Sequence, residues 1–447
     1  MDGFLPTLLR RKVRPPFLGQ LAQGGPASRM EVPERVVLPL QDTPDTPYEV
    51  VVRAEEVVRS GQLLGWMGKP PVRLGVHASI SGRVDRACPM PHPLGFNAHS
   101  VSIASDGREE MCGSSPLKAG EAGDNGQKAI ESFCEMGIPL NYGLIYKRGF
   151  KVSSLLVNAT EFEPYITSSH QLIREFPQNL VEGLKVLMGA CSASRAVVLL
   201  EKDQPSLIKA LKEAGKDTPG IAVRGAGRPY PETATRGLLL RKLFSRGSAP
   251  TEVMSVSLSS LFAIHRAWSS GDPFTEQLIT IAGSGIKNPQ NTWVKTGTPL
   301  AHIIQCSGGS PSCLGRVAVG GPLMGIPQHS LEVPLIKKAR GVFAAVAFLF
   351  DEHRKSRFYK RIPCVKCAKC VDVCPASIIP GFIAGLVDHK LFNDAEQWGV
   401  FNCIECGLCE YVCPSRIPLL ELMKLGKVSL GGEGCLLTRS NLESLSG

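Results

Sequence analysis

The sequence predicts a multidomain α+β protein in which two β-rich parts enclose an α/β middle part and a cysteine-rich helical part comes last. At 447 residues the chain is too long for one ordinary core, since domains usually contain about 100 to 200 residues. Short β-branched segments broken by Gly and Pro dominate near the N-terminus, whereas residues 127–250 alternate between helical and strand-like pieces. Many of the 15 cysteines stand in two runs between positions 364 and 413.

Composition and charge bound the class of protein. A hydrophobic content of 43% with 20% charged residues is ordinary for a folded globular chain. The longest apolar run, 341–350, is too short to span a bilayer, and the N-terminus places its basic residues after a short apolar stretch, the wrong order for a signal peptide. We therefore expect a cytoplasmic protein with no transmembrane segment.

The formal charge of +10 would suit an acidic partner, an anionic lipid surface or a nucleic acid. Because the basic residues are scattered, we interpret them as a solvated surface and expect no nucleic-acid binding. Clustered cysteines in a chain without an export signal indicate metal ligation rather than disulfides.

Residues 1–30, with Arg10, Arg11, Lys12 and Arg14 before two prolines, are expected to form an N-terminal tail. Residues 31–105 contain the short strands RVVLPL, YEVVVRA, QLLGWMG and GRVDRA, which predict a small β-barrel or sandwich. The segments VVRSGQLLG and VHASISGRV resemble the barrel-sandwich hybrid of biotinyl and lipoyl carriers. The hairpin that would present a carrier lysine shows no such motif, so a structural role is expected.

Residues 120–250 predict an α/β domain, with strands in VSSLLVNAT and SRAVVLLEK and helices in HQLIREFPQNLVEGLKVLMGA and QPSLIKALKEA. In residues 251–335 a helical segment, SLSSLFAIHRAWSSG, precedes a β-rich stretch, LITIAGSGIKNPQNTWVKTGTPLAHIIQ. The latter stretch resembles the small β-grasp SLBB module.

The cysteine pattern C-x2-C-x2-C-x3-C-P occurs twice in residues 345–425, as CVKCAKCVDVCP at 364–375 and CIECGLCEYVCP at 403–414. Three thiolates at this spacing wrap a loop around one face of a [4Fe-4S] cubane, and in two-cluster ferredoxins the fourth Cys binds the other cluster. One cluster is therefore assigned Cys364, Cys367, Cys370 and Cys413, and the other Cys403, Cys406, Cys409 and Cys374. The alternative is a pair of zinc sites, for which a third Cys after x2 and a C-P ending are not expected.

Gly407 is expected where the backbone passes close to the inorganic core. Between the motifs, Ile379, Ile383 and Leu386 have helical spacing, and this insert resembles the α-helical ferredoxin modules of larger redox subunits. The basic residues around the motifs would dock an acidic carrier or raise the cluster potential, with a merely solvated face as the equal alternative; they are Arg361, Lys366, Lys369 and Arg416. The remaining cysteines have no ligand spacing, and residues 426–447 are expected to form a tail.

Over about residues 31–425 the chain resembles the RnfC family, whose members are subunits of Rnf-type electron transport complexes. The resemblance is carried by VHASISGRV, NATEFEPYITSSHQLIRE, GSGIKNPQN, GGPLMG at 320–325 and CIECGLCEYVCPSRIPL. It implies an iron-sulfur electron-transfer subunit, peripheral on the cytoplasmic face of the inner membrane. The implied partners are the other subunits of the membrane complex and a ferredoxin- or flavodoxin-like carrier.

The middle domain of that family resembles the flavin subunit of respiratory complex I, where a glycine-rich loop binds the FMN phosphate through freed backbone N–H groups. This sequence departs from the pattern, because MGIPLNYGLIYKRGFK spreads Gly137, Gly143 and Gly149 apart. We therefore expect two [4Fe-4S] clusters and no ordinary FMN site, leaving Asn158 and Glu161 as the residues that would meet a flavin ring.

No catalytic residue is assigned, and two alternatives stay open. One is an NADH-oxidising flavoprotein subunit with an atypical FMN site, and the other is a corrinoid reductase of the kind associated with microcompartments.

Overall fold

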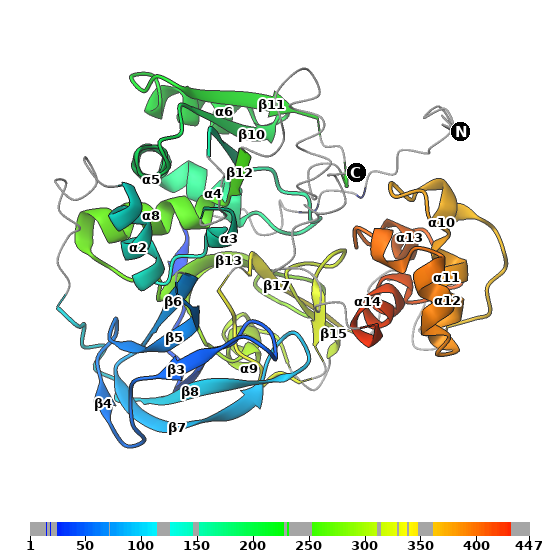
Figure 1. Ribbon diagram of the computed structural model, residues 1–447, viewed down its shortest axis with the longest axis horizontal. Coiled ribbons are helices and arrows are strands. Elements are labelled where there is room, and N and C mark those ends of the chain that lie inside the picture. Colours follow the sequence, from blue (N-terminus) through cyan, green and yellow to red (C-terminus); the bar gives the residue numbers. More distant parts are fainter. Residues whose placement is uncertain are drawn as a thin grey trace.

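The computed structural model describes residues 15, 18, 25–70, 72–113, 126–145, 152–227, 230–231, 253–310, 314–328, 330–337, 339–346 and 361–430. Figure 1 shows the β-rich N-terminal part below the α/β middle part, with a mixed sheet between them and the C-terminal helices at one side. Predictions for most of residues 1–24, for 347–360 and for 431–447 fall outside the described residues.

Two antiparallel sheets face one apolar core in the N-terminal part. The first has the order β2 (Arg35–Pro39), β8 (Asn97–Ser105), β7 (Gly82–Pro91) and β4 (Val57–Val58). The second has the order β3 (Tyr48–Val50), β5 (Leu63–Lys69) and β6 (Val72–His77). Alternating side chains such as Val36, Leu38, Val101 and Ile103 are buried between them, as the predicted sandwich requires.

The middle part is a parallel sheet with helices packed on it. Its strand order is β11 (Ile221–Ala226), β10 (Arg195–Glu201), β9 (Ser154–Asn158) and β12 (Val253–Val256). The helices are α2 (Gly126–Glu135), α3 (Tyr142–Ile145), α4 (Ser168–Glu175), α5 (Pro177–Cys191), α6 (Pro205–Ala214) and α8 (Leu258–Ser270). The helical segment 170–190 is divided at Phe176 because Pro177 starts a new helix at α5.

A six-stranded mixed sheet joins distant parts of the chain. Its order is β1 (Ser28–Arg29), β14 (Gln290–Lys295), β13 (Glu276–Ala282), β17 (Gly341–Val346), β15 (Leu314–Val319) and β16 (Ile326–Gln328). Residues 300–305, the end of the stretch expected to be β-rich, lie in helix α9 (Leu300–Cys306), whose apolar side chains at positions 300, 303 and 304 are buried. The assignment of this part as an SLBB β-grasp module stays a prediction.

The C-terminal part is helical. It contains α10 (Lys369–Asp372), α11 (Pro380–Asp388), α12 (Phe392–Gln397), the 3-10 helix η4 (Val400–Asn402), α13 (Leu408–Tyr411) and α14 (Leu419–Ser429). The helix predicted between the cysteine motifs is α11, with Ile383 fully buried in the core of this part. None of the helices in the described ranges has the length and apolar character needed to cross a bilayer.

Candidate metal centre

The two cysteine loops adopt the same backbone conformation. Lys366 and Glu405, at equivalent positions, both have φ of 55°, and Ala368 and Gly407 have φ of 59° and 72°. Each loop leads into a single helical turn, α10 after Ala368 and α13 after Gly407. The sequence repeat therefore produces a repeated local structure.

A backbone N–H points at the first sulfur of each loop. The N–H of Lys366 lies 3.4 Å from the sulfur of Cys364, and the N–H of Glu405 lies 3.4 Å from the sulfur of Cys403. Such N–H···S contacts stabilise a thiolate and are the kind that tune a bound iron-sulfur cluster.

The cysteines gather in two groups that cross between the motifs. Burial raises the pKa of the Cys370 thiol, and charge on Cys413 and Cys364 raises it further. Charge on Cys374 likewise adds to the effect of burial on the pKa values of the thiols in the second loop, which are Cys403, Cys406 and Cys409. Each fourth cysteine thus lies beside the other motif, as shared ligation requires; the individual ligand roles stay a prediction.

We call Cys364, Cys367, Cys370 and Cys413 the outer group and Cys374, Cys403, Cys406 and Cys409 the inner group. Cys364 and Cys367 are exposed, whereas three members of the inner group are buried, namely Cys374, Cys406 and Cys409. The two groups are therefore chemically alike and differ in their access to solvent.

The donor set fits iron-sulfur clusters. Burial raises the pKa of Cys403 to about 11 and of Cys406 to about 12, so these thiols stay protonated near neutral pH unless a metal supplies positive charge. Across the described part of the chain, no three His, Cys, Asp or Glu side chains gather as they would around a single metal ion.

The second cysteine loop, residues 403–413, carries three cysteines of the inner group, and we call it the inner loop. It packs against residues 320–325, the GGPLMG segment. A Cβ at Gly407 would lie 2.4 Å from the carbonyl oxygen of Leu323, so this position accepts only glycine. The Leu323 carbonyl gives a second reason for glycine here, and the expected close approach of this backbone to the inorganic core stays a prediction.

Side chains from three other elements hold the inner loop. The hydroxyl of Tyr230 donates a hydrogen bond to the carbonyl oxygen of Cys406, and its ring packs with Val373 and Leu408. Arg316 on β15 pairs with Glu410 at 3.4 Å and with Glu421 at 3.1 Å. Within the helical part, Lys427 donates to Glu405 at 2.7 Å and to the carbonyl of Cys403 at 2.6 Å.

The GGPLMG segment is held by the middle domain through Glu163. The carboxylate of Glu163 accepts the backbone N–H groups of Leu323 at 2.9 Å and Met324 at 2.6 Å. Burial raises the pKa of Glu163 to about 7, against the opposing effect of these two hydrogen bonds. Glu163 of the acidic segment NATEFEP therefore binds the same GGPLMG segment that contacts the inner loop at Gly407.

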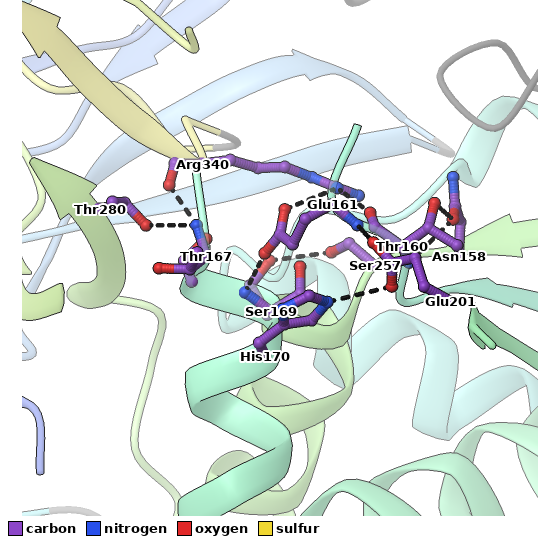
Figure 2. Close-up of polar contacts among 12 residues, drawn as sticks. Asn158, Thr160, Glu161, Thr167, Ser169, His170, Glu201, Ser257, Thr280 and Arg340 are labelled. Atoms are coloured by element: carbon purple, nitrogen blue, oxygen red, sulfur yellow. Dashed lines mark hydrogen bonds and ion pairs between the residues drawn. The ribbon is translucent and has the colours of Figure 1, made fainter. Parts of the chain in front are cut away.

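Glu161, two residues earlier, belongs to a buried polar network (Figure 2). Its carboxylate accepts the N–H of Ser169 at 2.5 Å and lies 3.9 Å from the guanidinium of Arg340. Glu201 accepts the backbone N–H of Glu161 at 2.7 Å and contacts the Nε2 atom of His170 at 3.0 Å. Burial raises the pKa of Glu161, while the charges of His170 and Arg340 oppose that rise.

The two residues predicted to meet a flavin ring are engaged within the chain. The side-chain oxygen of Asn158 accepts the N–H and the hydroxyl of Thr160, at 3.2 Å and 2.7 Å (Figure 2). Gly137 occupies the turn after α2 and Gly143 lies in α3, so these two glycines form no phosphate loop, and Gly149 lies outside the described residues. The contacts of Asn158 and Glu161 are those of packed structural residues.

Sequence reasoning missed the residues that join the cysteine loops to the rest of the chain. Glu163, Tyr230 and Arg316 were not singled out, although Glu163 stands in a quoted motif. Their partners are 94 to 176 positions away in the chain, and only the fold brings them together.

Three families match parts of the chain. The RnfC barrel-sandwich hybrid domain matches residues 9–108, the Nuo51 FMN-binding domain matches residues 135–258, and a 4Fe-4S dicluster domain matches residues 358–414. The first match extends into the segment predicted to be a tail.

Curated relatives share most of the chain. The RnfC protein of the ion-translocating oxidoreductase complex of Serratia proteamaculans is 30% identical over 433 residues, which is 94% of this chain and 60% of that protein. The protein of the same name from Erwinia tasmaniensis is 29% identical over 82% of this chain and 46% of its own length. This chain therefore spans about half the length of the curated relatives it matches.

A solved NAD+-reducing [NiFe]-hydrogenase in the air-oxidised state is a more distant likeness, with 15% identity and a TM-score of 0.43 over 71% of this chain and 57% of that one. The matched domains and the curated relatives agree with the motifs and the cysteine loops. The chain is a relative of the RnfC family, whose members are subunits of ion-translocating oxidoreductase complexes.

Proposed function

We propose that this chain is an iron-sulfur electron-transfer subunit of a membrane-associated, Rnf-like oxidoreductase complex, with two [4Fe-4S] clusters as its redox centres. The observation that carries the proposal is the crossed grouping of the motif cysteines, in which Cys413 lies with Cys364 and Cys370, and Cys374 lies with the thiols of the second loop, on two loops of the same shape. The 4Fe-4S dicluster match over the same residues supports it.

Bound clusters would supply one-electron chemistry at the two groups, and the residues of the chain set the conditions for it. The N–H groups of Lys366 and Glu405 favour negative charge on the first sulfur of each loop. Cys406 and Cys409 are buried, so the inner group is shielded from water. A cluster bound there would favour its less charged oxidation state, because charge is poorly solvated in such a site. Because each fourth cysteine belongs to the other group, the two centres are held at a constant separation.

The expected partners are the other subunits of such a complex and a ferredoxin- or flavodoxin-like carrier, on the cytoplasmic face of the inner membrane. The names of the curated relatives support membership in a complex. These assignments are carried over from a family whose members are longer than this chain.

A flavoprotein role is the second candidate, and the Nuo51 FMN-binding match over residues 135–258 favours it. The internal engagement of Asn158 and Glu161 weighs against it. A corrinoid reductase is the third hypothesis from the sequence. Neighbouring genes test it: genes for membrane subunits would argue against it, and genes for shell proteins would support it.

The experiment is to purify the protein without oxygen and to measure iron, sulfide and flavin, followed by EPR after reduction. We expect about eight irons and eight sulfides per chain and no flavin. Cys406→Ser should lose about half of the iron, whereas Cys191→Ser, outside the motifs, should lose none. Zinc in place of iron, or unchanged iron in Cys406→Ser, would refute the proposal, and stoichiometric FMN with NADH-dependent bleaching would favour the flavoprotein.

A further inference from the structure

The two cysteine loops have one shape and opposite surroundings. Equivalent positions differ in exposure. Exposed Lys366, Ala368 and Lys369 of the first loop correspond to buried Glu405, Gly407 and Leu408 of the second, and exposed Val365 corresponds to half-buried Ile404. The chain thus contains one docked and one undocked copy of the same structural unit.

The second loop shows what this unit does when it is docked. Leu408, 3% exposed, packs with Tyr230, and Gly407 receives the carbonyl of Leu323. This surface of the loop is a protein interface, formed within the chain beside the inner group.

The same surface of the first loop faces solvent. Nine of the ten residues from 361 to 370 are exposed, and Val365, equivalent to the half-buried Ile404, is 59% exposed. Ala368, the equivalent of Gly407, keeps its Cβ at a positive φ of 59° and is exposed, so no described part of this chain covers it as Leu323 covers Gly407.

Large apolar side chains surround this loop. Phe382, 46% exposed, follows Gly381, whose Cβ position lies 3.4 Å from the sulfur of Cys370. Trp398, 52% exposed, stacks edge-on against Phe382 with the ring centroids 4.6 Å apart. We define the outer face as these residues with their exposed neighbours, namely Ile362, Val365, Ile379, Phe382 and Trp398.

The first cysteine loop carries only basic charge over residues 361–371, and the exposed Asp372 follows it. Residues 361–371 contain Arg361, Lys366 and Lys369 and no acidic residue. Arg361 is paired with Asp388 at 2.6 Å, whereas Lys366 and Lys369 extend into solvent between the cysteines of the outer group. In the second, docked loop, Glu405 and Leu408 stand at the positions of Lys366 and Lys369. The two lysines are therefore a feature of the first loop alone.

We propose that the outer face docks a one-electron carrier protein whose redox centre lies near an apolar surface with an acidic rim. This inference rests on the proposed function and adds to it the point at which electrons enter or leave. Apolar contact would bring the two centres close, and the two lysines would steer the acidic partner, since opposite charges raise association rates. The inner group, covered by Tyr230 and Leu323, is left for transfer within the chain.

The test follows electron transfer from the dithionite-reduced holoprotein to a purified acidic two-[4Fe-4S] ferredoxin by stopped flow. Val365→Glu/Lys369→Glu and, separately, Trp398→Glu place negative charge on the outer face. We expect at least a tenfold slower second-order rate for the double variant, several-fold for Trp398→Glu, and a wild-type rate that falls as salt is added.

Two controls make the result specific. Val57→Glu/Lys69→Glu introduces the same charges on exposed residues of the N-terminal part and should leave the ferredoxin rate unchanged. Oxidation by benzyl viologen, which needs no protein docking, should be the same in all variants with full iron content.

Equal ferredoxin rates in wild type and in the two outer-face variants would overturn the proposal. A variant that changes the oligomeric state of the protein but not the ferredoxin rate would also overturn it, because the outer face would then be a contact between copies of this chain. If Val365→Glu/Lys369→Glu loses iron, its rate cannot be interpreted, and the ferredoxin rate of Trp398→Glu tests the proposal instead. A wild-type protein without clusters would instead refute the proposed function.

Discussion

Gly407 and Leu323 are in contact through backbone atoms, since a Cβ at Gly407 would lie 2.4 Å from the Leu323 carbonyl oxygen. This contact joins the inner cysteine loop to the segment that Glu163 holds against the middle domain. The inner group and the middle domain therefore form one structural unit.

Gly407→Ala should displace the inner loop. An alanine in this left-handed conformation costs about 1 to 2 kcal/mol, and the backbone contact with Leu323 adds to that cost. We expect loss of the inner cluster signal by EPR with the outer signal retained. Ala368→Gly, at the equivalent exposed position, is the matched control and should leave both signals intact; equal behaviour of the two variants would contradict the docked arrangement.

Glu163 should make stability fall as the pH rises. Its pKa is about 7 in the folded protein against 4.5 for an ordinary Glu, so between these values the folded state holds a proton that the unfolded state has lost. This difference in pKa corresponds to a stabilisation of about 3 kcal/mol that is fully present below pH 4.5 and is lost as the pH rises through about 7.

Thermal denaturation of wild type and Glu163→Gln between pH 5.5 and 8 measures this effect. The variant, which cannot ionise, should show the weaker decline with pH. If the melting temperatures of wild type and Glu163→Gln changed identically with pH, the raised pKa of Glu163 would be contradicted.

Tyr230→Phe should lower the reduction potential of the inner cluster and leave the outer cluster unchanged. The hydroxyl that donates to the Cys406 carbonyl places a positive dipole end beside the inner group, and its loss disfavours the added electron. Redox titration followed by EPR checks the direction. A shift in the outer potential alone would contradict the placement of Tyr230.

Cys374→Ser tests the crossing of ligands. Although Cys374 belongs to the first motif, its thiol neighbours those of Cys403, Cys406 and Cys409. We expect the inner cluster to be lost or converted, with the outer cluster's signal preserved. Loss of the outer cluster instead would mean that each motif binds its cluster with its own four cysteines.

Glu201→Ala should destabilise the middle domain, because it leaves His170 and the N–H of Glu161 without their buried acceptor. Removing one partner of a buried pair typically costs about 3 to 5 kcal/mol. Chemical denaturation measures the loss. Glu213→Ala, which removes an exposed pair between the end of α6 and Lys216 in the turn that follows it, should have no measurable effect.

Sequence alone determined the cysteine pattern, the helix between the two motifs and the alternation of strands and helices in the middle domain. These features depend on neighbours in the chain: a C-x2-C-x2-C loop sets its own spacing, and Pro177 suits the first turn of a helix because its fixed φ is helical. Residues 300–305, the last part of the stretch expected to be β-rich, lie in helix α9 instead, because burial of Leu300, Ile303 and Ile304 favours a helix there.

Only the tertiary structure decided which cysteine group is inner and which is outer. Two loops with the same motif and the same backbone became different because Leu323, Tyr230 and Arg316, far away in the chain, pack on one of them. Such contacts depend on the mutual packing of whole domains, and no local pattern of residues encodes that packing.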